Sequence, residues 1–169
     1  MEISTRFSPN ALATQSDINA VRAAWKRLSP LPGGKRLFSR FVGRAAPYTG
    51  PIRAVAQELQ DGYCRMTMAD RRSVRNHLKC VHAIALANLC EVTGNLALAY
   101  GLPDDARFIV AGMSLDYVKK ARGTITGECT FAPIETSAKK EYEVPVVLSD
   151  ANGDVVVRAT LRTLVGPKT

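Results

Sequence analysis

The longest apolar segment of the chain covers residues 81–100, where Glu91 is the only residue that carries a full charge at neutral pH. Nearly every direction of a helix over this segment is apolar or small, which is typical of a helix buried on all sides. Asn88, Glu91 and Asn95 are three and four residues apart, so they share one stripe with Ile84. A carboxylate buried there needs a hydrogen bond, an ion pair or a proton.

Two shorter amphipathic helices are predicted before this central helix. Ser16 can cap a helix that begins at Asp17, and a Pro- and Gly-rich stretch at residues 30–34 ends it. A second helix is predicted from Lys35 to Gly43. Arg36 and Arg40 lie on it and Arg44 at its end. They would suit a membrane surface or an acyl-carrier partner, but we favour packing of the helical pair over the main domain.

Extended segments are predicted on both sides of the central helix. Residues 52–68 alternate around Asp61-Gly62, which predicts two strands joined by a tight turn. Four further strands are predicted at residues 108–119, 124–131, 141–148 and 155–165. Because nothing else in the chain can cover the central helix, the strands must form one curved antiparallel sheet around it. The predicted fold is α+β, with residues 1–46 as an N-terminal lead-in and helical extension and residues 47–169 as the main domain.

Composition and charge narrow the function only a little. With 169 residues, 46% of them hydrophobic, the chain has the balance of a single soluble domain. A net charge of +8 suits an anionic partner, or serves solubility alone. No zinc-finger spacing, Gly-rich loop or aromatic RNA-binding motif is present, so no nucleic-acid partner is expected.

The cysteines and the N-terminus carry the remaining compositional signals. The cysteines lie at Cys64, Cys80, Cys90 and Cys129. They form no C-x-x-C pair and do not cluster with the histidines, so we expect free buried thiols and no metal site. The N-terminus lacks the apolar core of a secretory signal, and no apolar run reaches membrane-spanning length. We therefore expect a cytoplasmic protein without stable membrane insertion.

A spaced motif surrounds the start of the central helix. Asn76 is followed by His82 six residues later, and His82 by Glu91 nine residues further on. This spacing resembles the signature of the phenylacetate-degradation type of acyl-coenzyme A thioesterase, a branch of the hotdog-fold superfamily. In that signature an Asn precedes His-Gly-Gly and an acidic residue follows. Ala83 and Ile84 stand here in place of the two glycines, and Glu91 in place of Asp.

Longer strings resemble an uncharacterised bacterial subfamily of hotdog proteins, a domain of unknown function, from about Trp25 onward. These strings lie at residues 47–50, 75–78 and 117–123. The resemblance implies a hotdog fold, in which a six-stranded antiparallel sheet wraps a central helix and two subunits pair into one continuous sheet. It also implies hydrolysis of an acyl-coenzyme A at a site between two subunits of a homodimer, which can pair further into a tetramer. No cofactor is implied besides coenzyme A as part of the substrate.

Thioester hydrolysis needs a group that activates water and a group that stabilises the oxyanion. Glu91 is the candidate base or nucleophile, and the helix N-terminus around His82 and Ala83 offers free N–H groups for the oxyanion. His82 and Glu91 lie half a turn of azimuth apart, so they serve one site only if two subunits contribute. Asn76 is the third catalytic candidate. Structural alternatives remain for each: Glu91 as a bonded structural carboxylate, His82 as a helix cap, and Asn76 as a loop staple.

The predicted substrate-binding residues fall into two groups. On the helix they are Ala83, Ile84, Asn88 and Asn95. At the strand tip they are Lys119, Lys120 and Arg122, which could hold the phosphates of coenzyme A or could form a solvated turn. Ile84 is expected to narrow the space for substrate. The main alternative function is therefore a non-catalytic acyl or acyl-coenzyme A binding protein. A hydratase or dehydratase lacks its expected motif here, and a nucleic-acid binder rests on charge alone.

Overall fold

The computed structural model describes residues 19–168 of the chain. The helices are α1 (Ala20–Leu28), α2 (Gly34–Ala45) and α3 (Ala83–Gly101), with short 3-10 helices η2 (Gly50–Ile52) and η3 (Arg72–Val74). The strands are β1 (Val55–Gln60), β2 (Tyr63–Met68), β3 (Ala106–Tyr117), β4 (Ile125–Thr130), β5 (Lys140–Ser149) and β6 (Val155–Pro167). Each predicted helix and strand is therefore present, with ends shifted by a few residues.

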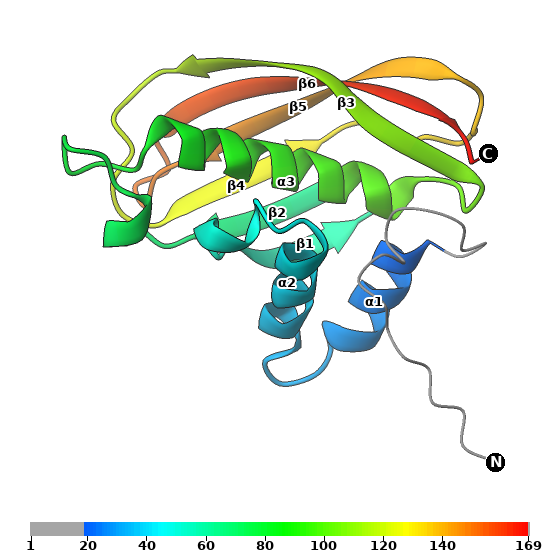
Figure 1. Cartoon of the computed structure of the whole chain (residues 1–169), viewed down its shortest axis with the longest axis horizontal. Coiled ribbons are helices and arrows are strands. Elements are labelled where there is room, and N and C mark those ends of the chain that lie inside the picture. The colour runs from blue at the N-terminus through cyan, green and yellow to red at the C-terminus, as the bar shows by residue number, and fades with distance from the viewer. Residues whose placement is uncertain (1–18, 169) are drawn as a thin grey trace.

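The six strands form one antiparallel sheet in the order β1-β2-β4-β5-β6-β3. The sheet curves around α3, while α1 and α2 lie on the side of α3 away from β3 (Figure 1). The predicted α+β hotdog architecture, six antiparallel strands around one central helix, is confirmed. The strand order could not be read from the chain, because β3 follows α3 directly yet pairs with β6 at the far edge.

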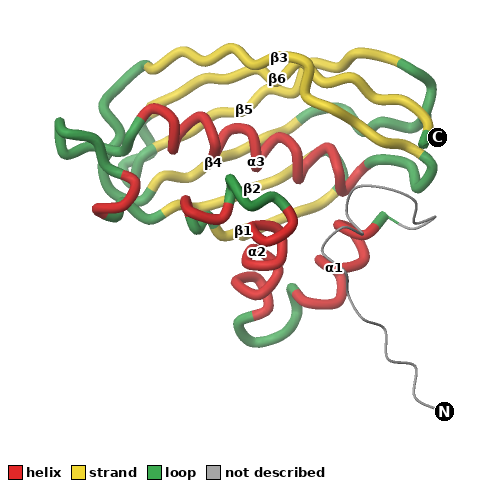
Figure 2. The backbone as a smooth tube through the Cα atoms, in the orientation of Figure 1, coloured by secondary structure: helices red, strands yellow, loops and turns green. Residues whose placement is uncertain are grey.

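Local contacts explain where the predicted ends were wrong. The central helix begins at Ala83, two residues later than expected, because Val81 forms an isolated bridge with Arg75. The N–H of Val81 also donates to the carbonyl of Ala121 at 2.9 Å. The predicted turn between β1 and β2 is confirmed, and Gly62 adopts the left-handed conformation there with φ 66°. At the N-terminal end of α3, the contacts of Val81 bring the loop before the helix together with the loop after β3 (Figure 2).

The central helix is buried on one side only. A Cβ at Gly94 would lie 2.1 Å from Leu161 Cδ1, so a larger residue there would force the Leu161 side chain of β6 to move. On the other side Ile84 is 54% exposed, and Glu91 and Asn95 are partly exposed. The expectation of a helix buried on all sides is wrong for the single chain. By length and composition alone α3 could cross a membrane, so the expectation that no apolar run reaches membrane-spanning length is wrong. Of the 18-residue stretch that meets this criterion, 61% is buried inside the protein.

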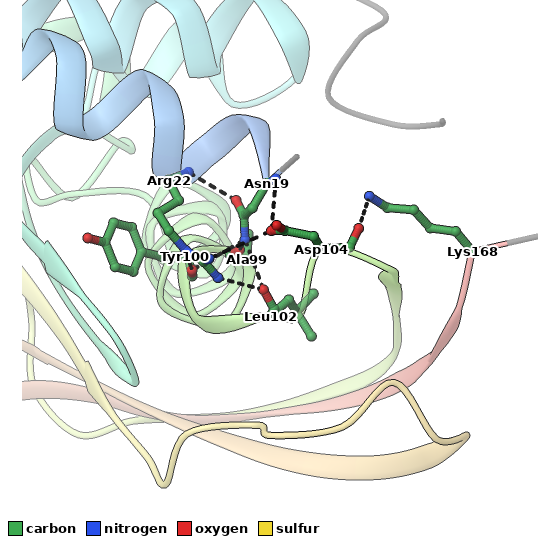
Figure 3. Close-up of polar contacts among 7 residues, drawn as sticks. All are labelled: Asn19, Arg22, Ala99, Tyr100, Leu102, Asp104 and Lys168. Atoms are coloured by element: carbon green, nitrogen blue, oxygen red, sulfur yellow. Dashed lines mark hydrogen bonds and ion pairs between the residues drawn. The ribbon is translucent and has the colours of Figure 1, made fainter. Parts of the chain in front are cut away.

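The first helix closes the C-terminal end of α3 (Figure 3). Ser16 and Asp17 lie outside the described residues, and α1 begins at Ala20 with Asn19 as its N-cap. Asn19 Oδ1 accepts from the N–H of Arg22 at 3.0 Å. Arg22 Nε donates to the carbonyl of Tyr100 at 2.9 Å, and Arg22 Nη2 to that of Leu102 at 2.7 Å. A cation thus satisfies carbonyls at the negative end of the helix.

Candidate functional site

A tight loop at residues 76–80 precedes the N-terminus of α3. The N–H of Asn76 donates to the carbonyl of Cys80 at 2.9 Å, and Asn76 Oδ1 accepts from the N–H of Leu78 at 2.9 Å. Lys79 adopts the left-handed conformation with φ 55° that such a tight loop needs. The side-chain oxygen of Asn76 therefore makes the contacts expected if Asn76 has a structural role in holding this loop together. A catalytic role for Asn76 stays a prediction.

His82 is the N-cap of α3. Its Nδ1 accepts from the N–H of Ile84 at 3.1 Å, and its carbonyl accepts the first helical bond, from Leu86, at 3.1 Å. Because Nδ1 is an acceptor, a neutral His82 carries its proton on Nε2. The N–H groups of Ala83 and Ala85 have no acceptor within residues 19–168. Two donors at the positive end of the helix are thus free for an anionic oxygen.

A cleft of about 270 Å³ lies beside this helix end. Its lining includes His82, Ile84 and Asn88 from the predicted set, together with Tyr48, Ser73 and Arg75. Ile84 lines the cleft and is 54% exposed. The structure therefore brings three predicted site residues together with others, such as Tyr48, Ser73 and Arg75, that were not predicted to belong to the site.

Asn88 has an unsatisfied oxygen in the wall of this cleft. The residue is only 7% exposed, and its Nδ2 donates to the carbonyl of Tyr48 at 3.0 Å. Its Oδ1 is buried and has no donor within the described chain. An unpaired buried acceptor costs about 1–3 kcal/mol, so a ligand that brings an N–H or O–H to it would be favoured.

Glu91 and Asn95 lie on the partly exposed side of α3 and do not line the cleft. The carboxylate of Glu91 has no hydrogen bond or ion pair within residues 19–168, so the isolated carboxylate has no partner in its own described chain. Of the pair His82 and Glu91, only His82 lines the cleft. The nearby thiol of Cys90 is no substitute nucleophile, because burial raises its pKa to about 12.

The loop after β3 packs against the same helix end. Besides the bond from Val81 to Ala121, Tyr117 Oη donates to the carbonyl of Ala83 at 3.1 Å. Burial is the main cause that raises the pKa of Tyr117, so this phenol remains a donor at neutral pH. The strand tip thus lies next to the free N–H groups.

The three predicted phosphate-binding cations differ in their contacts. Lys119 Nζ lies 3.0 Å from Asp150 Oδ2 and also contacts Asp154. Hydrogen bonds to these two carboxylates raise the pKa of Lys119. Lys120 and Arg122 are exposed and form no ion pair within the described chain. Lys119 is therefore engaged in holding the turn before β6, and Lys120 and Arg122 remain available for an anionic ligand.

A second ion pair, between Arg75 and Asp70, holds the segment that leads to α3. Arg75 Nε lies 2.7 Å from Asp70 Oδ1, and the N–H of Gly123 donates to Asp70 Oδ2 at 3.0 Å. The hydrogen bond from Arg75 is the largest cause that lowers the pKa of Asp70. Among the described residues no group of His, Cys, Asp or Glu could hold a metal ion. The four cysteines are free and buried, as expected.

Solved structures with the same fold define the class of this protein. A structural-genomics protein called APC5556 is 30% identical, with a TM-score of 0.77, covering 87% of this chain and 98% of its own. A Pseudomonas aeruginosa protein of unknown function, described as a probable thioesterase, is 24% identical, with a TM-score of 0.71, covering 81% and 97%. A Haemophilus influenzae thioesterase is 13% identical, with a TM-score of 0.63, covering 71% and 82%. By fold, the chain is a hotdog protein, and several of the structures that share its fold are described as thioesterases.

The chain belongs to the family described as domain of unknown function DUF4442, whose model matches residues 34–165. No curated protein is significantly similar in sequence. The matched range includes α2, α3, the strands β1 to β5 and β6 as far as Val165. The predicted membership of an uncharacterised hotdog family is therefore confirmed, while the phenylacetate-degradation branch stays a prediction.

Proposed function

We propose that this protein hydrolyses a thioester, with an acyl-coenzyme A as the substrate, in the manner of the phenylacetate-degradation branch. The observation that carries the proposal is the open N-terminus of α3. The free N–H groups of Ala83 and Ala85 there lie next to a cleft with the unpaired oxygen of Asn88. Such donors stabilise the oxyanion that forms when a thioester carbonyl is attacked.

We assign Glu91 as the base or nucleophile and place it across a subunit boundary. Within one chain it does not line the cleft that holds His82 and Asn88. Its position on the partly exposed side of α3 leaves it accessible to a second subunit. Lys120 and Arg122, beside the helix end, are proposed to bind phosphates of coenzyme A.

The edge of the sheet supports the homodimer that this site requires. In the described sheet β3 is the last strand, so one side of its 12 residues offers unpaired backbone groups. Ile109 is 67% exposed and Met113 is 40% exposed on this strand. Long apolar edge strands favour pairing with another copy. Because β3 ends at the N-terminus of α3, such pairing would bring a second chain close to the cleft.

The dimer proposal is tested by sedimentation of Ile109→Lys. We expect the wild type to be a dimer or tetramer, and Ile109→Lys to shift toward monomer with loss of hydrolysis. Leu31→Lys is the matched control, because Leu31 is 54% exposed but lies in the connection between α1 and α2. A monomeric wild type would contradict a site shared between subunits.

Activity is tested with a panel of acyl-coenzyme A esters and the variant Glu91→Gln. A general base contributes about 10²–10⁴-fold, so we expect hydrolysis by the wild type and a loss of that order in the variant. Equal activity in both proteins, or none in either, would contradict the proposal.

The second candidate is a non-catalytic acyl or acyl-coenzyme A binding protein. It is favoured by Ala83 and Ile84 in place of glycines, and by the distance along α3 between the cleft and Glu91. Calorimetry separates the two candidates, because this alternative predicts tight binding of acyl-coenzyme A without turnover.

A further inference from the structure

A second cleft, of about 590 Å³, lies between α2, β1 and the middle of α3. Its apolar lining, here called the floor, consists of Val42, Ala54, Val55, Met66 and Val92. Its rim carries Arg36, Arg40, Arg44 and Arg53. A Cβ at Gly43 would lie 3.0 Å from the Cα of Gly50, so α2 packs directly against the turn that leads to Arg53.

This cleft is separate from the one at the N-terminus of α3. The segment between α2 and β1 lines both clefts, but with different residues. Tyr48, Pro51 and Ile52 line the first cleft, whereas Thr49, Gly50 and Arg53 line the second. Nothing in the proposed hydrolysis uses the second cleft, so its basic rim needs its own explanation.

The four arginines of this rim, here called the arginine rim, lack the partners that other arginines have. Arg65, Arg75 and Arg162 form ion pairs with Glu58, Asp70 and Glu141. No member of the arginine rim forms an ion pair or side-chain hydrogen bond within residues 19–168, and no Asp or Glu lines this cleft.

This arrangement is unfavourable in the free protein. Arg36, Arg40 and Arg44 follow one another at intervals of four residues along α2, a spacing at which like charges destabilise a helix. Arg53 adopts the left-handed conformation with φ 50°, which is uncommon for a residue other than glycine. A bound anion would offset the repulsion among the four guanidinium groups.

We propose that this cleft binds a small ligand that carries two or more phosphate groups beside an apolar or aromatic part. Guanidinium groups bind phosphate oxygens through paired N–H bonds, and four of them match a multiply charged anion. A concave site with an apolar floor and a few polar groups at its edge is typical of small-ligand sites. These features favour a small molecule over a flat membrane surface.

The test measures binding by calorimetry to the full chain, with inorganic pyrophosphate, ADP and coenzyme A as probes. We expect all three to bind, with ADP and coenzyme A tighter than pyrophosphate because their organic parts can cover the floor. Arg40→Gln and Arg53→Gln should each weaken binding roughly tenfold, the loss expected for one charge-assisted hydrogen bond. Arg27→Gln is the matched control, since Arg27 is exposed on α1 and lines neither cleft.

Several outcomes would overturn the proposal. If Arg27→Gln weakens probe binding as much as the rim variants do, general charge attraction explains the binding. If pyrophosphate binds more tightly than both ADP and coenzyme A, the apolar floor does not contact the ligand. Binding to phosphatidylglycerol vesicles that pyrophosphate does not displace would indicate a membrane surface instead. Glu91→Gln should bind all probes like the wild type whether or not the chain hydrolyses thioesters, so the two proposals fail separately.

Discussion

The two ends of α3 differ in how their backbone groups are satisfied. At the C-terminal end, Asn19 and Arg22 donate to the carbonyls of Tyr100 and Leu102. At the N-terminal end, His82 caps the N–H of one residue, and two further N–H groups stay free within the described chain. The helix dipole places a partial positive charge at the N-terminal end and a partial negative charge at the C-terminal end. The closed end therefore secures the fold, and the open end is suited to bind and stabilise negative charge.

The surroundings of the two ends follow the same division. The open end borders a cleft and the exposed cations Lys120 and Arg122. The closed end is covered by α1, whose Trp25 packs edge-on against Phe38 of α2 at 5.0 Å between ring centroids. One helix thus separates binding from anchoring, and changes at its two ends should affect different measurements.

Among changes at the two ends of α3, the largest expected effect comes from Ala83→Pro. Ala83 is the first residue of α3, where proline is compatible with the helix, and His82 has the extended conformation that precedes proline readily. The substitution removes a free N–H and little else. If this N–H stabilises the oxyanion, kcat should fall by about 10²–10³-fold with only a small change in Tm.

Ala20→Pro is the control for this experiment. Ala20 holds the same first position in α1, after Asn19 in an extended conformation. It should leave kcat unchanged. Full activity of Ala83→Pro would show that this N–H does not take part in catalysis.

A smaller effect, on stability, is expected from Arg22→Ala. The variant leaves the carbonyl of Tyr100 and that of the buried Leu102 with fewer donors, at a cost of about 1–3 kcal/mol in the free energy of unfolding. Denaturant unfolding measures the loss, while kcat should not change. Arg27→Ala, on the exposed side of the same helix, should stay within about 0.5 kcal/mol of the wild type. A normal free energy of unfolding in Arg22→Ala would contradict the anchoring role.

The smallest expected effect is a change in Tm from Asp70→Asn. Asp70 holds the segment that leads to the N-terminal end of α3. Arg75 lowers the pKa of Asp70 in the folded state, so this contact stabilises the fold above the unfolded pKa of about 3.9. That contribution is lost as the pH falls through the lower, folded pKa. Asp70→Asn should therefore have a lower Tm than the wild type at pH 7, and the difference should shrink toward pH 2. A difference independent of pH would assign the effect to lost packing.

The sequence predicted the elements well because each has a clear period. A long, mostly apolar segment indicated α3, and alternation of apolar and polar residues indicated the strands. The order of the strands could not follow from local patterns, since the pairing of β3 with β6 joins segments far apart in the chain. The exposed side of α3 was also missed, because periodicity shows that a helix is apolar but not how much of it the sheet covers.

The candidate site was only partly predictable, for the same reason. His82 and Ile84 were predicted from the resemblance to the thioesterase signature and Asn88 from the spacing of the polar stripe, and all three line one cleft. Tyr48 and Ser73 come from segments without periodicity, and only the folded chain brings them there. The partners of Lys119 lie 31 and 35 residues away along the chain, so its ion pairs could not be foreseen.

The most direct test of the central claim mixes two inactive variants, Ala83→Pro and Glu91→Gln. If the open end of one subunit and Glu91 of the other form each site, a mixed dimer contains one site with both groups intact. After unfolding and refolding together in equal amounts, the mixture should recover about a quarter of wild-type activity, since half of the dimers are mixed and each has one of two sites. Activity no higher than that of the separate variants would contradict a site shared between subunits.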